Sequence, residues 1–332
     1  MEYQCICNFT VKKLIEQVLD EEKPPGVTPL FRAVNTECAL KLKNVFFKYE
    51  GAGPTGTQKD RISRLHINLA KSLGYDTVSV ATCGNYGASV SYFAYLNRMK
   101  SVVAIPSFYA GSRNSEIYEN GSDIIVKNMK YEDLVEYIKA KSASENWYNC
   151  SPSSENSWID ILGYRQIAYE IVQQLGHAPG YVAVPAGNGT TLAGIYSGFR
   201  KLFLAGEIDH VPRFIGSSTN LGNPIVYSWK HGYRKIQTLD AARIIETETN
   251  EPLVSFKAFD GQKALNAIYQ SKGAAIAVED SEMIRYSRII EHTQGIKVLP
   301  ASASALAAAH RYLRSRTYGR EVVIVLTGRG HN

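Results

Sequence analysis

The sequence NVFFKYEGAGPTGTQKDR at residues 44–61 decides the fold class, because it joins a predicted strand to a predicted helix through a glycine-rich turn. Residues 44–49 are mostly apolar and aromatic, as in a buried strand. Residues 58–73 predict an amphipathic helix. Its apolar residues recur at helical spacing: Ile62, Leu65, Leu69 and Leu73. Together these elements form the first strand–turn–helix unit of an α/β chain.

Strands and helices keep alternating along the chain beyond this unit. Further strands are predicted at residues 77–81, 101–105, 123–126, 181–184, 212–215 and 321–326. Further helices are predicted at residues 88–97, 112–120, 131–141, 163–175, 192–204, 281–293 and 302–315. This alternation is typical of parallel sheets covered by helices on both faces. Residues 149–157, rich in serine and asparagine, indicate the break between two α/β lobes, whereas residues 216–254 give no clear pattern.

Length and composition exclude several classes of protein. The 332 residues suffice for about two domains, and 45% hydrophobic residues are too many for a disordered chain. No stretch is apolar enough for a membrane-spanning helix, and the polar N-terminus is unlike a signal or transit peptide. We therefore expect a cytoplasmic protein with no membrane partner. The net charge of +6 is scattered rather than clustered, so we expect no nucleic-acid partner.

The cysteine pattern predicts reduced thiols. The five cysteines are an odd number without paired spacing, and no export signal precedes them. Cys5 and Cys7 lack the second pair of ligands that a structural zinc site requires, so we predict no metal.

The first turn contains Gly-x-Gly-x-x-Gly at residues 51–56, a pattern found in dinucleotide-binding folds. Such a site needs an acidic residue at the end of the next strand, but residues 77–81 are followed by Thr82-Cys83-Gly84. Pro54 also interrupts the turn, so nicotinamide or flavin binding is disfavoured. Lys59 opens the following helix, where the helix dipole disfavours an ammonium. It is either a solvated lysine or an amine of lowered pKa that can form a Schiff base with an aldehyde.

Three other turns also carry polar groups at the carboxyl ends of predicted strands. Residues 81–89 (ATCGNYGAS) combine hydroxyls, an amide and a helix N-terminus, which suits a carboxylate, although Asn85 can equally be a helix cap. Residues 184–191 (VPAGNGTT) form either a tight turn or a phosphate cup. Thr327 follows the last strand and can bond a ligand in the shared crevice. An amine, a phosphate cup and polar partners match pyridoxal phosphate, whose amino-acid substrate supplies the carboxylate.

The same motifs resemble the tryptophan-synthase-β type (fold type II) of pyridoxal-phosphate enzymes, and within it the threonine synthase family. Residues 26–30 (GVTPL) resemble G-x-T-P-L, residues 48–61 resemble K-x-E-x-x-N-P-T-G-S-F-K-D-R, and residues 82–89 resemble S-C-G-N-A-G-A-S. The remaining matches are residues 184–189 with V-P-V-G-N-A-G, residues 299–306 with E-P-A-S-A-A-S-L, and residues 326–330 with L-T-G-H-G.

This resemblance implies two lobes of parallel sheet covered by helices. Residues 1–50 with 155–332 would form a larger cofactor-binding domain and residues 51–154 a smaller one, with the active site between them. The family resemblance also suggests a homodimer. Lys59 would be the catalytic residue, forming the Schiff base and shuttling protons. The other cofactor-binding residues would be Asn85 at the phenolic oxygen, Thr327 at the ring nitrogen, and Ala186, Gly187, Asn188, Gly189 and Thr190 at the phosphate.

The resemblance also implies substrate-binding residues. Thr82, Asn85 and Tyr86 would hold the substrate carboxylate. Arg61 would either assist a substrate phosphate or pair with a neighbouring acid. The sequence departs from the family around the substrate: Gln58 replaces Phe, Tyr86 replaces Ala, Leu299 replaces Glu and Arg329 replaces His. The family segment A-I-R-I-G-N-P is not recognisable at residues 241–246.

The resemblance therefore predicts a carbon–oxygen lyase acting on phosphates, which converts O-phospho-L-homoserine and water into L-threonine and phosphate. The bulk of Tyr86 favours instead a β-eliminase or β-replacement synthase acting on serine, threonine or O-phosphoserine. The altered substrate surroundings also leave open a non-catalytic relative that binds the cofactor or an amino acid and regulates a partner. Retention of Lys59 argues against that last hypothesis.

Overall fold

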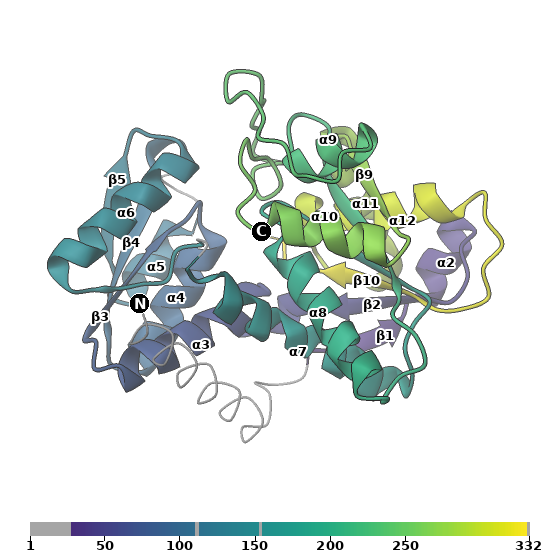
Figure 1. Ribbon diagram of the computed structural model, residues 1–332, viewed down its shortest axis with the longest axis horizontal. Helices are drawn as coiled ribbons and strands as arrows, with labels where there is room; N and C mark the ends of the chain where they lie inside the picture. The colour runs from purple at the N-terminus through teal and green to yellow at the C-terminus, as the bar shows by residue number, and fades with distance from the viewer. Residues whose placement is uncertain (1–27, 110–112, 153–154, 331–332) are drawn as a thin grey trace.

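The computed structural model describes residues 28–109, 113–152 and 155–330, whose strands form two separate sheets (Figure 1). The smaller sheet has the order β5-β4-β3-β6, and the larger has the order β1-β2-β10-β7-β8-β9. Neighbouring strands are parallel throughout, except that β1 runs antiparallel to β2. The carboxyl ends of the parallel strands in each sheet therefore lie at one edge, where ligands bind in this class of fold.

The strands of the smaller sheet are β3 (Thr77–Ala81), β4 (Lys100–Pro106), β5 (Asp123–Lys127) and β6 (Tyr148–Asn149). Those of the larger sheet are β1 (Leu30–Arg32), β2 (Val45–Tyr49), β7 (Tyr181–Pro185), β8 (Arg213–Thr219), β9 (Ala274–Val278) and β10 (Val322–Leu326). The strands fall within the two ranges predicted for the two domains. The domain boundaries themselves stay a prediction.

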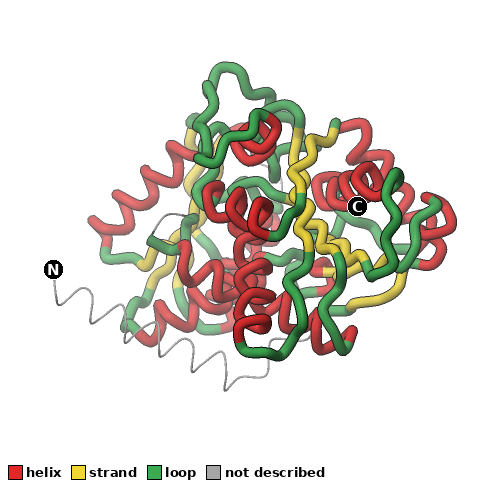
Figure 2. Tube along the Cα trace, turned by 45° about the vertical axis from the view of Figure 1, so that its right-hand side comes forward, coloured by secondary structure: helices red, strands yellow, loops and turns green. Residues whose placement is uncertain are grey.

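Helices cover both faces of the strands, as Figure 2 shows in red and yellow. Those next to the smaller sheet are α4 (Asn85–Leu96), α5 (Asn114–Glu119) and α6 (Tyr131–Glu145). Between the sheets run α3 (Lys59–Ser72) and α7 (Ser157–Leu175). The others are α2 (Val34–Leu40), α8 (Thr190–Leu204), α9 (Pro224–Lys230), α10 (Gly261–Gln270), α11 (Asp280–Gln294) and α12 (Pro300–Leu313). Short 3-10 turns occupy Glu50–Ala52 and Ser107–Tyr109.

The central strand β10 divides its side chains between two apolar cores. Val323 and Val325 are buried in the core that includes α8 and α10, whereas Ile324 is buried in the core that includes α11 and α12. Because both faces of β10 are covered, the strand reads VVIVL without a polar residue. In the smaller sheet, Val80 and Ala81 face different cores in the same way.

The structure contains every strand and helix that the sequence predicts, most of them with shifted ends. The helix expected at residues 88–97 begins at Asn85, and the helix expected at residues 163–175 begins at Ser157. Six elements were not predicted: β1, α2, β6, α9, α10 and β9. Five of them are shorter than eight residues and too short to show a period. None of the described helices has the length and apolarity needed to cross a membrane.

Candidate active site

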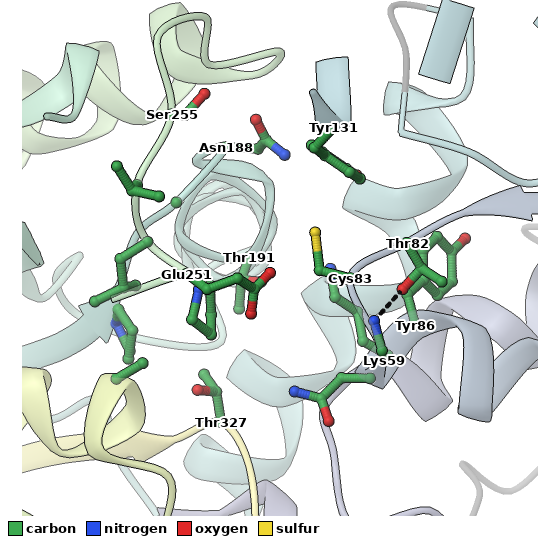
Figure 3. Close-up of a pocket in the computed structure, with 18 of the residues that line it drawn as sticks. Lys59, Thr82, Cys83, Tyr86, Tyr131, Asn188, Thr191, Glu251, Ser255 and Thr327 are labelled. Carbon is green, nitrogen blue, oxygen red and sulfur yellow. Dashed lines mark hydrogen bonds between the residues drawn. The ribbon is translucent and has the colours of Figure 1, made fainter. Parts of the chain in front are cut away.

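A cavity of about 290 Å³ collects the turns that the sequence singled out (Figure 3). Its walls include most residues of the predicted site: Lys59, Thr82, Asn85, Tyr86, Gly187, Asn188, Gly189, Thr190 and Thr327. Ala186 is buried behind the turn, and Arg61 lies outside the cavity wall. The turns after β3, β7 and β10, far apart in the sequence, thus meet at one place.

Lys59 is the first residue of α3 and is positioned by the end of β10. The N–H of Gln58 donates to the carbonyl of Thr327 over 2.9 Å, and Thr57 pairs with Gly328 in an antiparallel bridge. The Nζ of Lys59 lies 5.2 Å from the ring centroid of Tyr86. Burial lowers the pKa of Lys59, although Asp160 and Glu251 oppose the shift. A larger fraction of this amine is therefore neutral and nucleophilic than for a lysine in water.

The turn after β7 has the form of an anion cup at the start of α8. Asn223 stabilises this turn, because its side-chain amide donates to the carbonyls of Ala186 (3.2 Å) and Gly187 (3.1 Å). Figure 3 shows Asn188 and Thr191 beside the cavity. The hydroxyl of Thr190 donates to the buried carboxylate of Asp260 over 2.8 Å. The cup therefore offers the N-terminus of a helix and the hydroxyl of Thr191, a residue that the sequence analysis placed in the turn but not among the cofactor-binding residues.

The turn after β3 presents the N-terminus of α4 to the cavity. The hydroxyl of Thr82 accepts the N–H groups of Gly84 (3.0 Å) and Gly87 (3.1 Å), which fixes the turn. Gly84 has a φ of 145°, a conformation that glycine adopts at little cost. Gly84 is the N-cap residue, so the alternative that Asn85 is only a helix cap is wrong. Asn85 lines the cavity, and its side-chain oxygen accepts a hydrogen bond from Arg113 over 2.9 Å.

Tyr86 does not fill the substrate space in the way that its bulk suggested. Its hydroxyl turns into the protein and donates to the carbonyl of Cys150 over 2.8 Å. Tyr86 is 4% exposed, and its ring lies beside the Lys59 amine. The phenol is therefore not available to a substrate carboxylate, and its size gives no argument for a short substrate.

Arg61 takes the second of its two predicted roles and pairs with acids. Its guanidinium donates to Glu170 over 2.6 Å and 2.8 Å and to Glu50 over 2.5 Å and 3.0 Å. Lys48 joins the same cluster through Glu170. All four side chains are buried, and none lines the cavity. The prediction that Arg61 assists a substrate phosphate is wrong, because Glu50 and Glu170 already engage its donors.

Thr327 ends the central strand and is fixed from both sides. Its N–H donates to the hydroxyl of Ser302 over 2.7 Å, and its carbonyl accepts the N–H of Gln58. The side chain lies at the lower wall of the cavity in Figure 3, facing the space between Lys59 and Glu251. A neutral hydroxyl therefore stands where the sequence analysis expects the partner of the ring nitrogen.

A comparison with known protein families shows which family the chain belongs to. A family model described as pyridoxal-phosphate dependent enzyme matches residues 22–328. The chain belongs to this family. The prediction of pyridoxal phosphate as cofactor is thereby confirmed. Among the described residues, no group of three or more His, Cys, Asp or Glu side chains could hold a metal ion. Cys5 and Cys7 lie outside the described residues.

Several relatives of this pyridoxal-phosphate enzyme are threonine synthases. The chain is 30% identical to the threonine synthase of Methanocaldococcus jannaschii over 314 residues, covering 92% of this chain and 74% of the relative. It is 28% identical to that of Synechocystis sp. over 307 residues, covering 92% and 76%. The resemblance found in the sequence motifs is confirmed by these matches.

Solved structures confirm the architecture. Serine racemase from Dictyostelium discoideum aligns with a TM-score of 0.76 and 17% identity, covering 97% of this chain and 98% of that one. An L-serine ammonia-lyase from the fungus Rhizomucor miehei aligns with a TM-score of 0.76 and 22% identity, covering 93% and 95%. At these identities the likeness shows the fold alone, which is the predicted fold type II architecture with parallel sheets.

The residues around the cavity fit pyridoxal phosphate on structural grounds. An amine of lowered pKa, a helix N-terminus and a hydroxyl stand on three different walls. The cup also leaves no room for larger side chains, because a Cβ on Gly187 would come within 2.4 Å of the Pro252 carbonyl oxygen. Anions bind in such glycine-rich turns through backbone N–H groups.

This close approach predicts the effect of a single methyl group. In a Gly187→Ala variant the cup or the segment that carries Pro252 must shift, so we expect affinity for pyridoxal phosphate to fall at least about tenfold. Titrating the cofactor-free protein with pyridoxal phosphate and following its absorbance measures this affinity. Gly319→Ala is the control, because a Cβ there meets no atom within 4 Å. Equal affinities of the two variants would contradict the prediction.

One wall of the cavity is acidic, which no sequence pattern predicted. Three carboxylates line it: Glu132, Glu246 and Glu251. Figure 3 shows the Glu251 carboxylate between Thr191 and Cys83. Burial, together with the charge of Glu246, raises the pKa of Glu251 to about 7, although the Cys83 thiol donates a hydrogen bond to it. No motif marks these residues, because they come from α6 and from the segment between α9 and α10, whose sequence shows no periodic pattern.

The raised pKa of Glu251 predicts a pH-dependent stability. Between the ordinary pKa of 4.5 and about 7 the folded state binds more protons than the unfolded state, so this group lowers the free energy of unfolding as the pH rises. In Glu251→Gln this loss is absent. We expect the cofactor-free variant to be more stable than the wild type by up to about 3 kcal/mol near pH 8, and by less near pH 5. Urea denaturation at both pH values checks this, and an equal difference at both would contradict it.

Proposed function

We propose that this pyridoxal-phosphate enzyme is a lyase acting on an L-α-amino acid, with Lys59 as its catalytic amine. The observation that carries the proposal is the position of Lys59, whose pKa is lowered by burial and whose cavity also contains the anion cup and Thr327. When bound, pyridoxal phosphate supplies an aldehyde and a ring that accepts negative charge from the substrate Cα.

Each wall of the cavity then has a separate task. The cup at residues 186–190 would hold the cofactor phosphate, Asn85 would face its phenolic oxygen, and Thr327 would face its ring nitrogen. The N-terminus of α4, with Thr82, Asn85 and the backbone N–H of Tyr86, would hold the substrate carboxylate. Lys59 would accept the proton from Cα and return it later in the reaction. A neutral hydroxyl at the ring nitrogen withdraws less charge than a carboxylate would, which suits elimination.

The first candidate reaction is that of threonine synthase, O-phospho-L-homoserine and water giving L-threonine and phosphate. It is supported by the similarity to threonine synthases over 92% of the chain. We also propose that the protein is a cytoplasmic homodimer, as the sequence analysis expected. Sedimentation of the purified protein tests the dimer.

A second candidate is elimination or replacement at Cβ of an amino acid without a phosphate. The observation that favours it is the charge of the cavity wall. Of the described residues that line the cavity, three are glutamates, two are lysines and none is an arginine. Arg61, the residue expected to meet a substrate phosphate, is buried elsewhere. The cavity wall therefore offers few cations to bind a doubly charged substrate phosphate.

One experiment separates these candidates. The holoenzyme is incubated in parallel with O-phospho-L-homoserine, O-phospho-L-serine, L-serine and L-threonine, and phosphate, threonine, ammonia and 2-oxo acid are measured. Threonine and phosphate from O-phospho-L-homoserine would establish the first candidate. Products only from L-serine or L-threonine would establish the second, whereas products only from O-phospho-L-serine would contradict both. Cofactor binding without product from any amino acid would contradict the lyase and support a regulatory relative.

A further inference from the structure

The acidic wall brings carboxylates from two parts of the molecule to one cavity. Glu132 is in the first turn of α6, which packs on the smaller sheet. Glu246 and Glu251 belong to residues 231–260, the irregular segment between α9 and α10 that is green in Figure 1. The substrate space of the proposed lyase is therefore bordered by acids, and one of them, Glu251, contacts Cys83 of the turn after β3.

Contacts between α6 and this segment hold the acids in place. The hydroxyl of Ser255 donates to Glu132 over 3.1 Å, and the Lys130 ammonium donates to the carbonyl of Ala241 over 2.9 Å. Pro252 packs on the cup at Gly187, which fixes the neighbouring Glu251. Glu132 and Glu251 are thus half-buried and built into the wall, whereas Glu246 is exposed.

These carboxylates have no cationic partner of their own. Glu132, Glu246 and Glu251 form no ion pair with any described lysine, arginine or histidine within 4.0 Å. Their hydrogen-bond donors are neutral: Ser255 for Glu132, Tyr109 for Glu246 and Cys83 for Glu251. Unpaired carboxylates in a partly buried cavity attract a cation more strongly than they would in water.

The net charge of the cavity becomes more negative when the cofactor is bound. Lys59 is committed to the cofactor in the proposed function, and the cofactor brings a phosphate of its own. Lys130 is then the remaining lysine among the described residues of the wall, and its ammonium already bonds a carbonyl. A second phosphate on the substrate would be repelled, whereas an ammonium would be attracted.

We propose that the substrate is a short L-α-amino acid whose side chain ends in an ammonium group, recognised by Glu251 together with Glu132 and Glu246. The proposal rests on the proposed lyase function and selects its second candidate. Tyr131, which lies across the cavity from Glu251 in Figure 3, offers an aromatic face to the same ammonium. The α-carboxylate remains at the N-terminus of α4, so the substrate spans the cavity between the two lobes.

Binding to the holoenzyme tests the proposal with nearly isosteric pairs. L-2,3-diaminopropionate is compared with L-serine, and L-2,4-diaminobutyrate with L-homoserine, near pH 8, where Glu251 is ionised. O-phospho-L-serine and O-phospho-L-homoserine complete the set. The change in cofactor absorbance gives the half-saturating concentration of each amino acid. We expect at least one diamino acid to bind about tenfold more tightly than its hydroxyl counterpart, and both phosphorylated compounds to bind more weakly still.

Variants test whether the acidic wall causes the preference for a diamino acid. Glu251→Gln should reduce the ratio of diamino to hydroxyl affinity about tenfold. Glu145→Gln, in an exposed pair with Lys141, is the matched control and should keep the ratio. If Glu251→Gln fails to fold, the comparison of diamino and hydroxyl amino acids with the wild-type protein still tests the proposal.

Two results would overturn the inference: tightest binding of a phosphorylated amino acid, or a Glu251→Gln ratio equal to that of the control. Neither contradicts the lyase. The lyase itself fails if the wild-type protein shows no cofactor absorbance that depends on Lys59, or if no amino acid gives product. The failure of one proposal is therefore distinguishable from the failure of the other.

Discussion

Lys59→Ala is expected to reduce turnover by about 10³-fold or more with whichever amino acid proves to be the substrate. The side chain supplies the only amine among the described residues that is both in the cavity beside Thr82 and lowered in pKa by burial. In the proposed function, the site without this side chain loses both the group that joins the cofactor aldehyde and the group that carries the substrate proton. The visible absorbance of the bound cofactor should change at the same time, because free and lysine-bound aldehydes absorb differently.

Lys71→Ala is the matched control for this variant. Lys71 lies in the last turn of the same helix and is exposed, so its loss leaves the cavity intact. Turnover and absorbance should both match the wild type. Full activity of Lys59→Ala would rule out every lyase mechanism proposed for this site, whereas loss of activity in both variants would indicate damage to α3 rather than loss of the amine.

Glu170→Ala is expected to lower the free energy of unfolding by about 3–5 kcal/mol. The Glu170 carboxylate is 1% exposed and accepts from the Lys48 ammonium over 2.5 Å and from the Arg61 guanidinium over 2.6 Å. Removing it leaves two buried cations with the single carboxylate of Glu50. These same cations hold the pKa of Glu170 below its ordinary value despite the opposing effect of burial.

Urea denaturation of the cofactor-free protein measures this loss. Glu155→Ala is the control, because Glu155 pairs with Lys139 over 2.7 Å on the surface, and such pairs contribute about 1 kcal/mol or less. A loss for Glu170→Ala no larger than that of the control would mean that water or a shifted side chain compensates the buried cations.

The sequence predicted those parts of the site that depend on local chemistry. Gly187 and Gly189 predict a turn whose backbone can approach a ligand. Lys59 is an unusual residue at the start of a helix, because the helix dipole disfavours its charge there. Parallel strands carry their turns to one edge of a sheet, so the cup and Thr327 could be expected together. These residues are recognisable because the reason for each lies within a few neighbours in the chain.

The remaining features depend on contacts between distant residues. Arg61 follows Lys59 by two positions, yet its partner Glu170 comes from α7, and only the packing of α3 on α7 decides that they meet. Tyr86 turns inward because the carbonyl of Cys150 accepts its hydroxyl. Glu251 reaches the cavity through an irregular segment. A pattern in the sequence cannot reveal such pairings, because no period or motif links the partners.

The position of β10 has a consequence for synthesis. It is the last of the ten described strands in the chain, yet it lies between β2 and β7 in the larger sheet and carries Thr327 into the site. While a ribosome is still making residues 322–327, β2 and β7 have no strand between them, and their facing edges are unpaired. The smaller sheet, whose strands are contiguous in the chain, can form earlier. A nascent chain therefore exposes unpaired strand edges until late in translation, and the cavity that Thr327 lines cannot be complete before then.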